Sequence, residues 1–187
     1  ISHNLGVAPE MIWVKKRSEA TDWNVYHSGL GPTKTIWLNQ PSTGNTHQDY
    51  WYNTAPTSSV FSVGGGNPNN YTTRTYVAFL FATLAGVSKV GSYTGNATNN
   101  RVIDCGFSSG ARFVLVKEAN NYNYWFMFDS IRGITTASTD GVLRPSDGDA
   151  SQAEGTNLIS PHSSGFMVSN ASTLNNNDGN FIFYAIA

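Results

Sequence analysis

The chain contains one stretch of sequence twice. A constant offset of 102 relates residues that are identical in the two copies: Ile1 and Ile103, Val14 and Val116, Lys15 and Lys117, Trp23 and Trp125, Ser28 and Ser130, Gly31 and Gly133. Further along the offset becomes 105, as for Phe61 and Phe166, which indicates a three-residue insertion in a loop of the second copy. Two copies are too few for a solenoid. The sequence therefore predicts a single domain, residues 1–187, built from pseudo-twofold-related repeats 1–82 and 103–187 and a connector 83–102.

Each copy contains short apolar runs that are rich in β-branched and aromatic residues and are bounded by turn residues. The runs are MIWVKK, WNVYH, TIWLN, VFSV and TYVAFLFA in the first copy, and FVLVKE, WFMFD, GVLRP, FMVS and NFIFYAIA in the second. None has the length or the 3.6-residue period of a helix, so each predicts a strand. With a further strand KVGSYTG in the connector, the sequence predicts an all-β fold, an antiparallel β-sandwich of the jelly-roll or lectin-like type.

Composition excludes several classes of partner. The net charge is −1 and the isoelectric point is near 6.4, whereas binding to nucleic acid or to an anionic membrane surface requires clustered Lys and Arg. No apolar run approaches the roughly 18 residues of a membrane span. Charged residues make up only 12% of the chain and aromatic residues 13%. This profile is typical of an extracellular β-protein with a polar but uncharged surface, and we expect no nucleic acid partner and no membrane insertion.

The sequence also lacks the common signatures of cofactor and metal sites. Cys105 is the only cysteine, so no disulfide can form within the chain, and this suits assembly in a reducing cytoplasm. The histidines do not have the spacing of a zinc site, and no nucleophile elbow or P-loop is present. The N-terminal ISHNLG has neither a starting Met nor the features of a signal peptide. We therefore expect a fragment of a longer protein, with no cofactor and no catalytic residues.

The repeat divides the aromatic residues into two groups. Those that are aromatic in both copies are expected in the core: Trp23 and Trp125, Tyr26 and Phe128, Phe61 and Phe166, Tyr76 and Phe181, Phe79 and Tyr184. Those that occur in one copy only are candidates for function: Trp37, Tyr50, Trp51, Tyr52 and Tyr71 in the first copy, Tyr122 and Tyr124 in the second.

The densest group of candidates is the segment HQDYWYN, whose counterpart in the second copy has no aromatic residue. Sugar sites combine flat aromatic faces with nearby groups that hydrogen-bond to hydroxyls. The predicted ligand-binding residues are therefore His47, Asp49, Tyr50, Trp51, Tyr52 and Asn53, with Trp37, Tyr122 and Tyr124 as further aromatic candidates. The alternative for Trp51 is a structural role, in which it anchors the loop to the sandwich.

A weaker candidate is a calcium site at the DGD sequence. Asp147 and Asp149 could offer two carboxylates to the ion. The segment lacks the ligand spacing of an EF-hand, so a solvated turn is the preferred interpretation and no metal is predicted.

Several strings together resemble a known family. HNLGVAPEMIWVKKR, DWNVYHSGL, WYNTAPTSSVF, YVAFLFA and VGSYTGNAT are similar to a repeated β-rich domain of predicted tail-fibre and other structural proteins of bacteriophages, many of them marine. In that family the SYTGN string leads into the LGVAPE string, as the connector does before the second copy here. The resemblance implies a location on the virion surface, outside the cell, and transfers no ligand or catalytic residue. It also favours a structural Trp51, since WYNTAPTSSVF resembles a common string of the family.

Three classes of function follow from these observations. The first is a non-catalytic domain of a phage tail fibre that binds a glycan or receptor, with host cell-surface polysaccharide as the partner. The second is a structural, decoration or oligomerisation domain of the virion, and in either case we expect a homo-oligomer, such as a trimer, in the parent fibre. The third is a polysaccharide depolymerase. It is disfavoured because the few acidic residues are scattered rather than paired.

Overall fold

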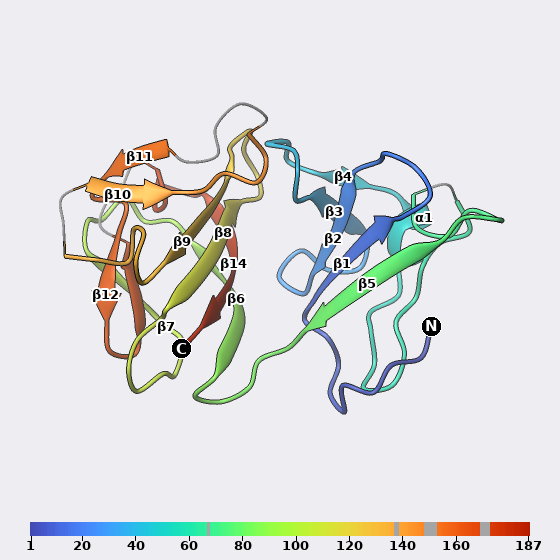
Figure 1. Ribbon diagram of the computed structural model, residues 1–187, viewed down its shortest axis with the longest axis horizontal. Helices are drawn as coiled ribbons and strands as arrows, with labels where there is room; N and C mark the ends of the chain where they lie inside the picture. Colours follow the sequence, from blue (N-terminus) through green and yellow to red (C-terminus); the bar gives the residue numbers. More distant parts are fainter. Residues whose placement is uncertain (67, 137–138, 148–152, 169–172) are drawn as a thin grey trace. The chain divides into compact units, whose positions relative to one another are not determined.

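The computed structural model describes residues 1–66, 68–136, 139–147, 153–168 and 173–187. It divides into two compact units, Ile1–Ala82 (unit 1) and Thr83–Ala187 (unit 2), and each is described by itself. Both are built from antiparallel sheets (Figure 1). The prediction of an all-β fold is confirmed. The described residues include a single helix of four residues, and none of their helices is long and apolar enough to cross a membrane.

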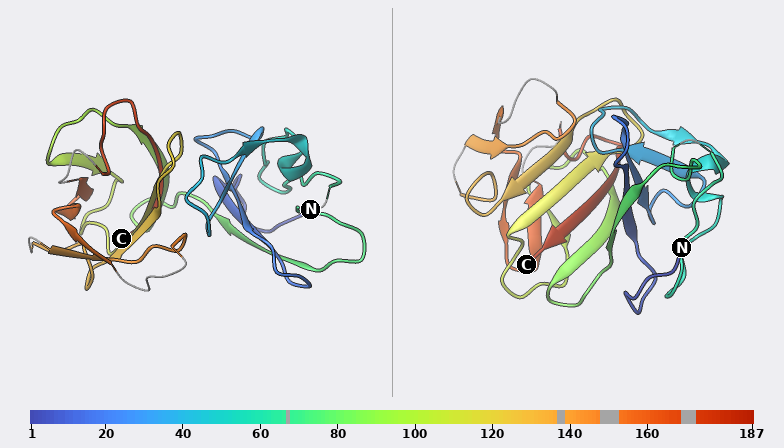
Figure 2. Two further views of the ribbon diagram at one scale, coloured as in Figure 1. Left: turned by 90° about the horizontal axis from the view of Figure 1, so that it is seen from above. Right: turned by 45° about the vertical axis from the view of Figure 1, so that its right-hand side comes forward.

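Unit 1 is one antiparallel sheet with a short helix against one face. The strands are β1 (Met11–Lys16), β2 (Trp23–His27), β3 (Lys34–Trp37), β4 (Asn45–Thr46) and β5 (Tyr76–Phe81), in the order β4-β3-β2-β1-β5, and the helix is α1 (Gln48–Trp51). The left view of Figure 2 shows α1 on one side of this sheet. Ile12, Val14 and Tyr26 of the sheet pack with Trp51 and Phe61 in one buried cluster.

Unit 2 is a sandwich of two sheets. One sheet has the order β6-β14-β8-β9 and the other β12-β13-β7, with a separate hairpin β10-β11. The bounds are β6 (Ser88–Thr94), β7 (Arg101–Asp104), β8 (Phe113–Glu118), β9 (Trp125–Asp129), β10 (Thr139–Val142), β11 (Ala153–Thr156), β12 (Ile159–His162), β13 (Gly165–Val168) and β14 (Asn180–Ile186). Val116, Phe128 and Phe181 of the first sheet meet Ile103 and Phe166 of the second in one buried core.

The Asn-rich loops of unit 2 are held by buried polar groups. The carboxylate of Glu118, which is only 4% exposed, accepts hydrogen bonds from the side-chain amides of Asn121 (3.2 Å), Asn123 (3.1 Å) and Asn176 (2.7 Å). A buried carboxylate requires such partners. Asn121, Asn123 and Asn176 therefore brace the loops at the end of β8 against the Glu118 carboxylate.

The strands of unit 1 and unit 2 pair in the same register: residues that pair in unit 1 have counterparts, 102 or 105 residues later, that pair in unit 2. In unit 1 Met11 pairs with His27 and with Phe81; in unit 2 Phe113, which is 102 residues after Met11, pairs with Asp129 and with Ile186. The isolated bridge between Ser2 and Val60 likewise corresponds to the pair Asp104 and Gly165. The strand order β2-β1-β5 thus has its counterpart in β9-β8-β14. The pseudo-twofold axis and the single sandwich of both repeats stay predictions.

The sorting of aromatic residues by the repeat holds for most of the predicted core. Tyr26, Phe128, Phe61 and Phe166 are buried, as are Trp125 and Phe181. Trp23, Tyr76 and Tyr184 are only half-buried, and Phe79 is a correction, because it is 43% exposed on the edge strand β5. A position on an edge strand has a neighbouring strand on one side only, so a large side chain there keeps part of its surface in water.

Candidate functional site

The aromatic segment predicted as a loop contains a single helical turn. His47 is the N-cap of α1, where its ring Nδ1 accepts a hydrogen bond from the Asp49 amide at 3.2 Å. Tyr52 ends the turn in the left-handed conformation with φ 54°, and Asn53 follows with φ 49°. Since successive side chains on a helical turn point in different directions, the three consecutive aromatic residues do not share one surface.

Trp51 is a core residue, and its assignment to a ligand surface is corrected. It is 1% exposed, and its ring packs edge-on against Tyr26 at a centroid distance of 5.7 Å. A ring with no exposed face cannot stack on a sugar. The structural role that the sequence left open for Trp51 is therefore the one observed.

Tyr50 and Trp37 come together at a pocket on the helix-bearing side of the sheet. Their ring centroids lie 6.2 Å apart and the ring planes meet at 73°, so the two rings form a corner. The pocket has a volume of about 180 Å³ and is lined by Lys16, Thr21, Asp22, Asn24, Trp37, Tyr50 and Pro68. We call it the Trp37–Tyr50 pocket.

The position of Trp37 follows from strand register. Trp37 of β3 pairs directly with Asn24 of β2, and paired residues of adjacent strands share a face. The Asn24 side-chain amide donates to Asn69 Oδ1 at 2.9 Å, and the Asn69 amide donates to the Tyr50 carbonyl at 3.0 Å. This chain of hydrogen bonds ties β2 to α1 through Asn24 and Tyr50, both of which line the pocket.

Charged groups at the rim of the pocket are held in pairs. Lys16 Nζ lies 3.1 Å from Glu19 Oε2, and Arg74 pairs with the same carboxylate. The hydrogen bond from Lys16, with the positive charges of Lys16 and Arg74, holds the pKa of Glu19 below its ordinary value against partial desolvation. Asp22 accepts a hydrogen bond from the Asn39 amide at 2.9 Å. Lys16 is itself only 2% exposed and already paired, so the group that can still accept a hydrogen bond from a hydroxyl is the Asp22 carboxylate.

The Tyr50 hydroxyl is a fixed polar group. Burial raises its pKa above the ordinary value, and the carboxylates of Asp22 and Asp49 act in the same direction, while hydrogen bonds with the side chains of Asn45 and Trp37 oppose them. The hydroxyl is therefore un-ionised at neutral pH. Tyr50 therefore presents a neutral ring in a fixed orientation, and its hydroxyl does not act as an acid or a base at neutral pH.

The other candidates from the sequence lie elsewhere. Tyr52 is 64% exposed and lines a separate pocket of about 620 Å³ with Ile1, Val60, Phe61, Ser62, Val63, Gly65 and Asn70. His47, Asp49 and Asn53 do not line the Trp37–Tyr50 pocket, although the first two are in contact, with His47 Nδ1 3.5 Å from Asp49 Oδ2. Tyr122 and Tyr124 belong to unit 2, where Tyr122 is 75% exposed and Tyr124 lies beneath the guanidinium of Arg144. Of the predicted ligand-binding residues, Trp37 and Tyr50 are therefore the two that line the Trp37–Tyr50 pocket.

Neither calcium candidate gains support. Asp147 lies 3.8 Å from Arg144, an arrangement that favours an ion pair over a cation site, and Asp149 lies outside the described residues. Within the described ranges no three His, Cys, Asp or Glu side chains are grouped as metal ligands would be.

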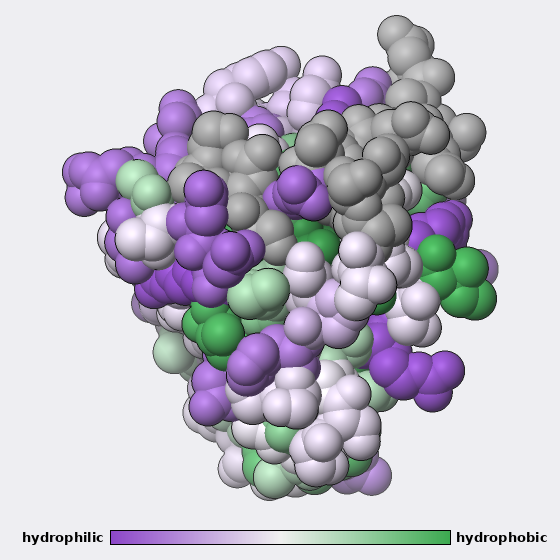
Figure 3. Space-filling view, turned by 90° about the vertical axis from the view of Figure 1, so that its left-hand side faces the viewer, coloured by the Kyte–Doolittle hydropathy of each residue, from purple (hydrophilic) through white to green (hydrophobic). Residues whose placement is uncertain are grey.

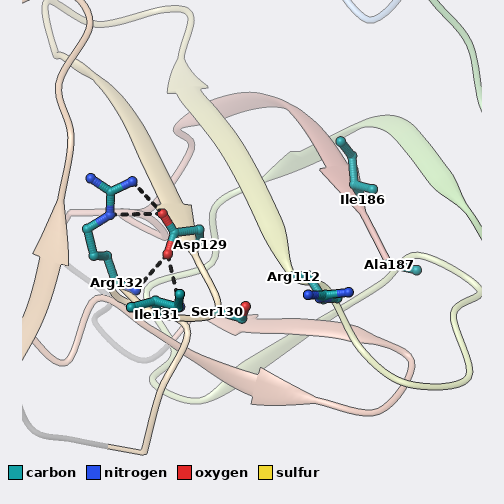
Figure 4. A pocket seen from close by; sticks show the side chains of 7 residues that line it. All are labelled: Arg112, Asp129, Ser130, Ile131, Arg132, Ile186 and Ala187. Atoms are coloured by element: carbon teal, nitrogen blue, oxygen red, sulfur yellow. Dashed lines mark hydrogen bonds and ion pairs between the residues drawn. The ribbon is translucent and has the colours of Figure 1, made fainter.

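A larger pocket in unit 2 is less suited to a sugar. It has a volume of about 590 Å³, and Figure 4 shows its lining residues Arg112, Asp129, Ser130, Ile131, Arg132, Ile186 and Ala187. The Asp129 carboxylate accepts hydrogen bonds from the amides of Ile131 (2.9 Å) and Arg132 (2.8 Å) and from the Arg132 side chain (2.9 Å). Desolvation raises its pKa, but these bonds and the charge of Arg132 outweigh it and leave the pKa lowered. The Asp129 carboxylate is thus occupied by hydrogen bonds within its own turn. No aromatic ring is among the residues that line the pocket.

Five residues that line the pocket were not predicted from the sequence: Lys16, Thr21, Asp22, Asn24 and Pro68. Lys16, Asp22 and Asn24 lie 13 or more residues before Trp37 and far from the aromatic segment. A signal for Asn24 was present, because a polar residue inside the apolar strand WNVYH is unexpected unless it has a structural or binding role. Its repeat counterpart, Phe126, is apolar and buried.

Comparisons with known proteins give a family without a known activity. A family model described as a domain of unknown function (DUF7483) matches residues 1–187. No curated protein and no solved structure matches the chain. The function of the pocket therefore has to follow from the chemistry of its own residues.

Proposed function

The chain belongs to this family of domains of unknown function (DUF7483), and we propose that it is a non-catalytic carbohydrate-binding domain whose ligand site is the Trp37–Tyr50 pocket. The observation that carries the proposal is the corner formed by the two rings, at 73° to each other, beside the polar groups of Lys16, Asp22 and Asn24. Aromatic faces with a few oriented polar groups are what a sugar ring requires.

The ligand is a neutral sugar unit within a longer glycan. Its C–H face lies against Trp37 or Tyr50, and its hydroxyls donate to the Asp22 carboxylate. A pocket of about 180 Å³ has room for a single small ligand unit, so the rest of the glycan extends into solvent. Because Lys16 is buried and paired with Glu19, the ammonium group leaves little net charge at the pocket, which favours an uncharged sugar.

The biological setting is proposed from the sequence resemblance. A domain of a phage tail fibre on the virion surface would use such a pocket to bind host cell-surface polysaccharide as a receptor. One site of this size binds weakly by itself, but several copies in an oligomeric fibre act together through avidity. The low overall charge, 12% of residues, is compatible with a polysaccharide partner.

A structural or oligomerisation role in a virion is the second candidate. It is favoured by one feature of unit 1, the uncharged edge strand β5, with the sequence YVAFLF. It is not favoured by the face of unit 2 in Figure 3, where hydrophobic side chains are scattered among polar ones over the described residues. Interaction faces between subunits are more often contiguous apolar patches.

A depolymerase is the least supported function. Glycoside hydrolysis needs two carboxyl groups on opposite sides of the scissile bond. Near the Trp37–Tyr50 pocket, Glu19 pairs with Lys16 and Arg74, and Asp22 is bonded to Asn39. We therefore propose binding without turnover.

The test is a glycan array with the whole chain, followed by calorimetric titration of the best ligand. Trp37→Ala is expected to weaken binding roughly 5- to 100-fold, as loss of one stacking ring is worth about 1–3 kcal/mol by analogy with base stacking. Tyr50→Phe, which keeps the ring and removes the hydroxyl, is expected to change affinity by less than about tenfold, the size of one hydrogen bond.

Two matched controls use exposed tyrosines outside the pocket. Tyr52→Ala and Tyr122→Ala each remove an aromatic ring that is more than half exposed and does not line the Trp37–Tyr50 pocket. Both variants should bind the glycan as the unmodified chain does. Wild-type affinity in a folded Trp37→Ala protein, or loss of affinity in either control, would place the site elsewhere.

A further inference from the structure

Strand β5 of unit 1 and strand β14 of unit 2 occupy equivalent positions but differ in one respect. β14 pairs with β8 on one side and with β6 on the other. β5 pairs with β1, and no strand among the described residues pairs with its second side, so it is an edge strand (Figure 1). The offset of 105 relates the two strands residue by residue: Lys16 pairs with Tyr76 in unit 1, and Glu118 with Phe181 in unit 2.

The backbone groups on the outer side of β5 are oriented for a further strand. The Glu10 amide donates to the Phe81 carbonyl at 2.9 Å. The backbone carbonyl of Phe81 therefore points toward β1. Neighbouring residues of a strand point their amide and carbonyl groups to opposite sides, so those of Ala78 and Leu80 point outward. Their counterparts in β14, Phe183 and Ala185, pair with Gly91 and Lys89 of β6. The Ala78 side chain is exposed.

β5 also lacks the features that protect edge strands from pairing. Natural edges are usually very short, charged or interrupted by Pro. The opposite edge of the same sheet, β4, is only two residues long. β5 has six residues, YVAFLF, with neither a charge nor a proline, and its Phe79 is 43% exposed. Such an edge is a template for another strand.

We propose that the outer edge of β5 is a docking site for an extended antiparallel strand of the β6 type, supplied by a second copy of this sequence. In the register of β6 on β14, the strand places its Tyr opposite Tyr76, its Gly opposite Ala78 and its Val opposite Phe79.

Contacts within unit 2 show why this sequence fits. Tyr93 of β6 stacks on Phe181, with centroids 4.9 Å apart and planes at 10°. The counterpart of Phe181 on β5 is Tyr76, which offers an aromatic ring to the docking strand at the same position. Val90 of β6 is 2% exposed opposite Tyr184, and a valine opposite Phe79 would likewise cover exposed aromatic surface. Pairs of aromatic and β-branched residues across strands are stabilising.

The inference does not depend on the proposed carbohydrate site, because it concerns the strand edge and not the Trp37–Tyr50 pocket. The probe is a fluorescent peptide with the sequence of residues 85–96, AGVSKVGSYTGN, titrated into the whole chain and followed by anisotropy. Saturable binding is expected. Ala78→Pro, which removes one outward N–H at an edge where proline is tolerated, is expected to weaken binding at least about tenfold.

Two N-methylated peptides keep the test independent of folding. Methylation at the position of Gly91 removes an amide that faces β14 in the β6 register, whereas methylation at the position of Ser92 removes one that faces away. The first peptide should lose roughly tenfold in affinity, and the second should bind as the parent does. Equal effects of the two methyl groups would overturn the proposal. So would unchanged binding to a folded Ala78→Pro chain, because the peptide would then be exchanging with β6 on β14. Absence of peptide binding, or pairing of β5 with the β5 strand of a second chain in place of a β6-type strand, would also overturn it.

Discussion

Trp51 and Tyr52 are neighbours in the sequence, yet one is 1% exposed and the other 64%. The difference arises because Trp51 closes a helical turn against Tyr26, while Tyr52 leaves that turn in the left-handed conformation. Residue type alone does not distinguish an anchor from a contact residue here. Among the described residues the indole N–H of Trp51 has no hydrogen-bond partner, and its ring packs against Tyr26.

Trp51→Ala is expected to lower the free energy of unfolding by about 3–5 kcal/mol, the usual cost of truncating a buried aromatic residue. Tyr52→Ala is expected to change it by less than about 0.5 kcal/mol, as is usual for an exposed side chain. Urea denaturation of the two variants measures the difference. Similar midpoints for both would mean that Trp51 is not part of the core.

Lys117 provides a second prediction at the residue scale. It is fully buried in β8, where its Nζ donates to the carbonyls of Glu118 (2.5 Å) and Asn121 (3.3 Å). Burial lowers its pKa from 10.5 to about 8, and the Glu118 carboxylate opposes this effect. Between about pH 8 and pH 10.5 the unfolded chain therefore binds more protons at Lys117 than the folded chain does. The contribution of Lys117 to the free energy of unfolding consequently rises as the pH increases through this interval.

Lys117→Met should remove this contribution. The change in unfolding free energy between pH 7 and pH 10 is expected to differ from that of the unmodified chain by roughly 2 kcal/mol. Other groups that titrate in the same range are present in both proteins, so the comparison isolates Lys117. Identical pH profiles of the two proteins would show that the ammonium group is solvated in the native state.

The element that positions Tyr50 is the helical turn α1, and the GGG sequence holds it in place. A β-carbon on Gly64 would lie 2.4 Å from backbone atoms of Asp49, and one on Gly66 would lie 2.4 Å from the Asp49 carboxylate. The Gly64 amide also donates to the Tyr50 carbonyl at 3.2 Å. Gly64 and Gly66 therefore permit a close approach between the GGG sequence and α1 that larger side chains would prevent.

Alanine at Gly64 is expected to destabilise the chain by about 1–3 kcal/mol, the usual range for overpacking, because backbone cannot move aside as a side chain can. Gly66→Ala should be milder, since it meets the flexible end of Asp49. Gly65→Ala is the matched control, with no atom within 4 Å of the added carbon. Thermal melts of the three variants should rank Gly64 as the most sensitive. A Gly65 variant as unstable as the Gly64 variant would contradict the close-approach explanation.

At the scale of the whole molecule, the periodicity of short apolar runs was sufficient to predict an all-β fold. The repeat offsets also agree with the observed pairing, as Met11 with Phe81 and Phe113 with Ile186 show. The pocket was predictable only in part. Trp37 and Tyr50 stood out as aromatic residues present in one copy, but Lys16, Asp22 and Asn24 join them through tertiary contacts that no spacing rule contains. The helical turn was missed because four residues are too few to display a period.

The proposed binding by many weak sites makes a prediction about assembly. A fusion of the whole chain to a trimeric coiled coil is expected to bind an immobilised polymeric glycan about 10²–10⁴ times more tightly than the monomer does, because the second and third contacts become intramolecular. The same trimer should bind a single sugar unit with the affinity of the monomer, since each Trp37–Tyr50 pocket is formed within one unit 1.

Surface plasmon resonance on the polymer and calorimetry with the single sugar measure the two affinities. The control is a trimer that carries Trp37→Ala. It should lose most of the increase in affinity for the polymer, because the affinity of a trimer falls with the loss at each of its three sites. If the trimer instead binds the single sugar more tightly than the monomer, residues of neighbouring copies contribute to the site and the pocket of one chain is incomplete. If it gains nothing on the polymer, the pocket does not recognise a repeating unit of that glycan.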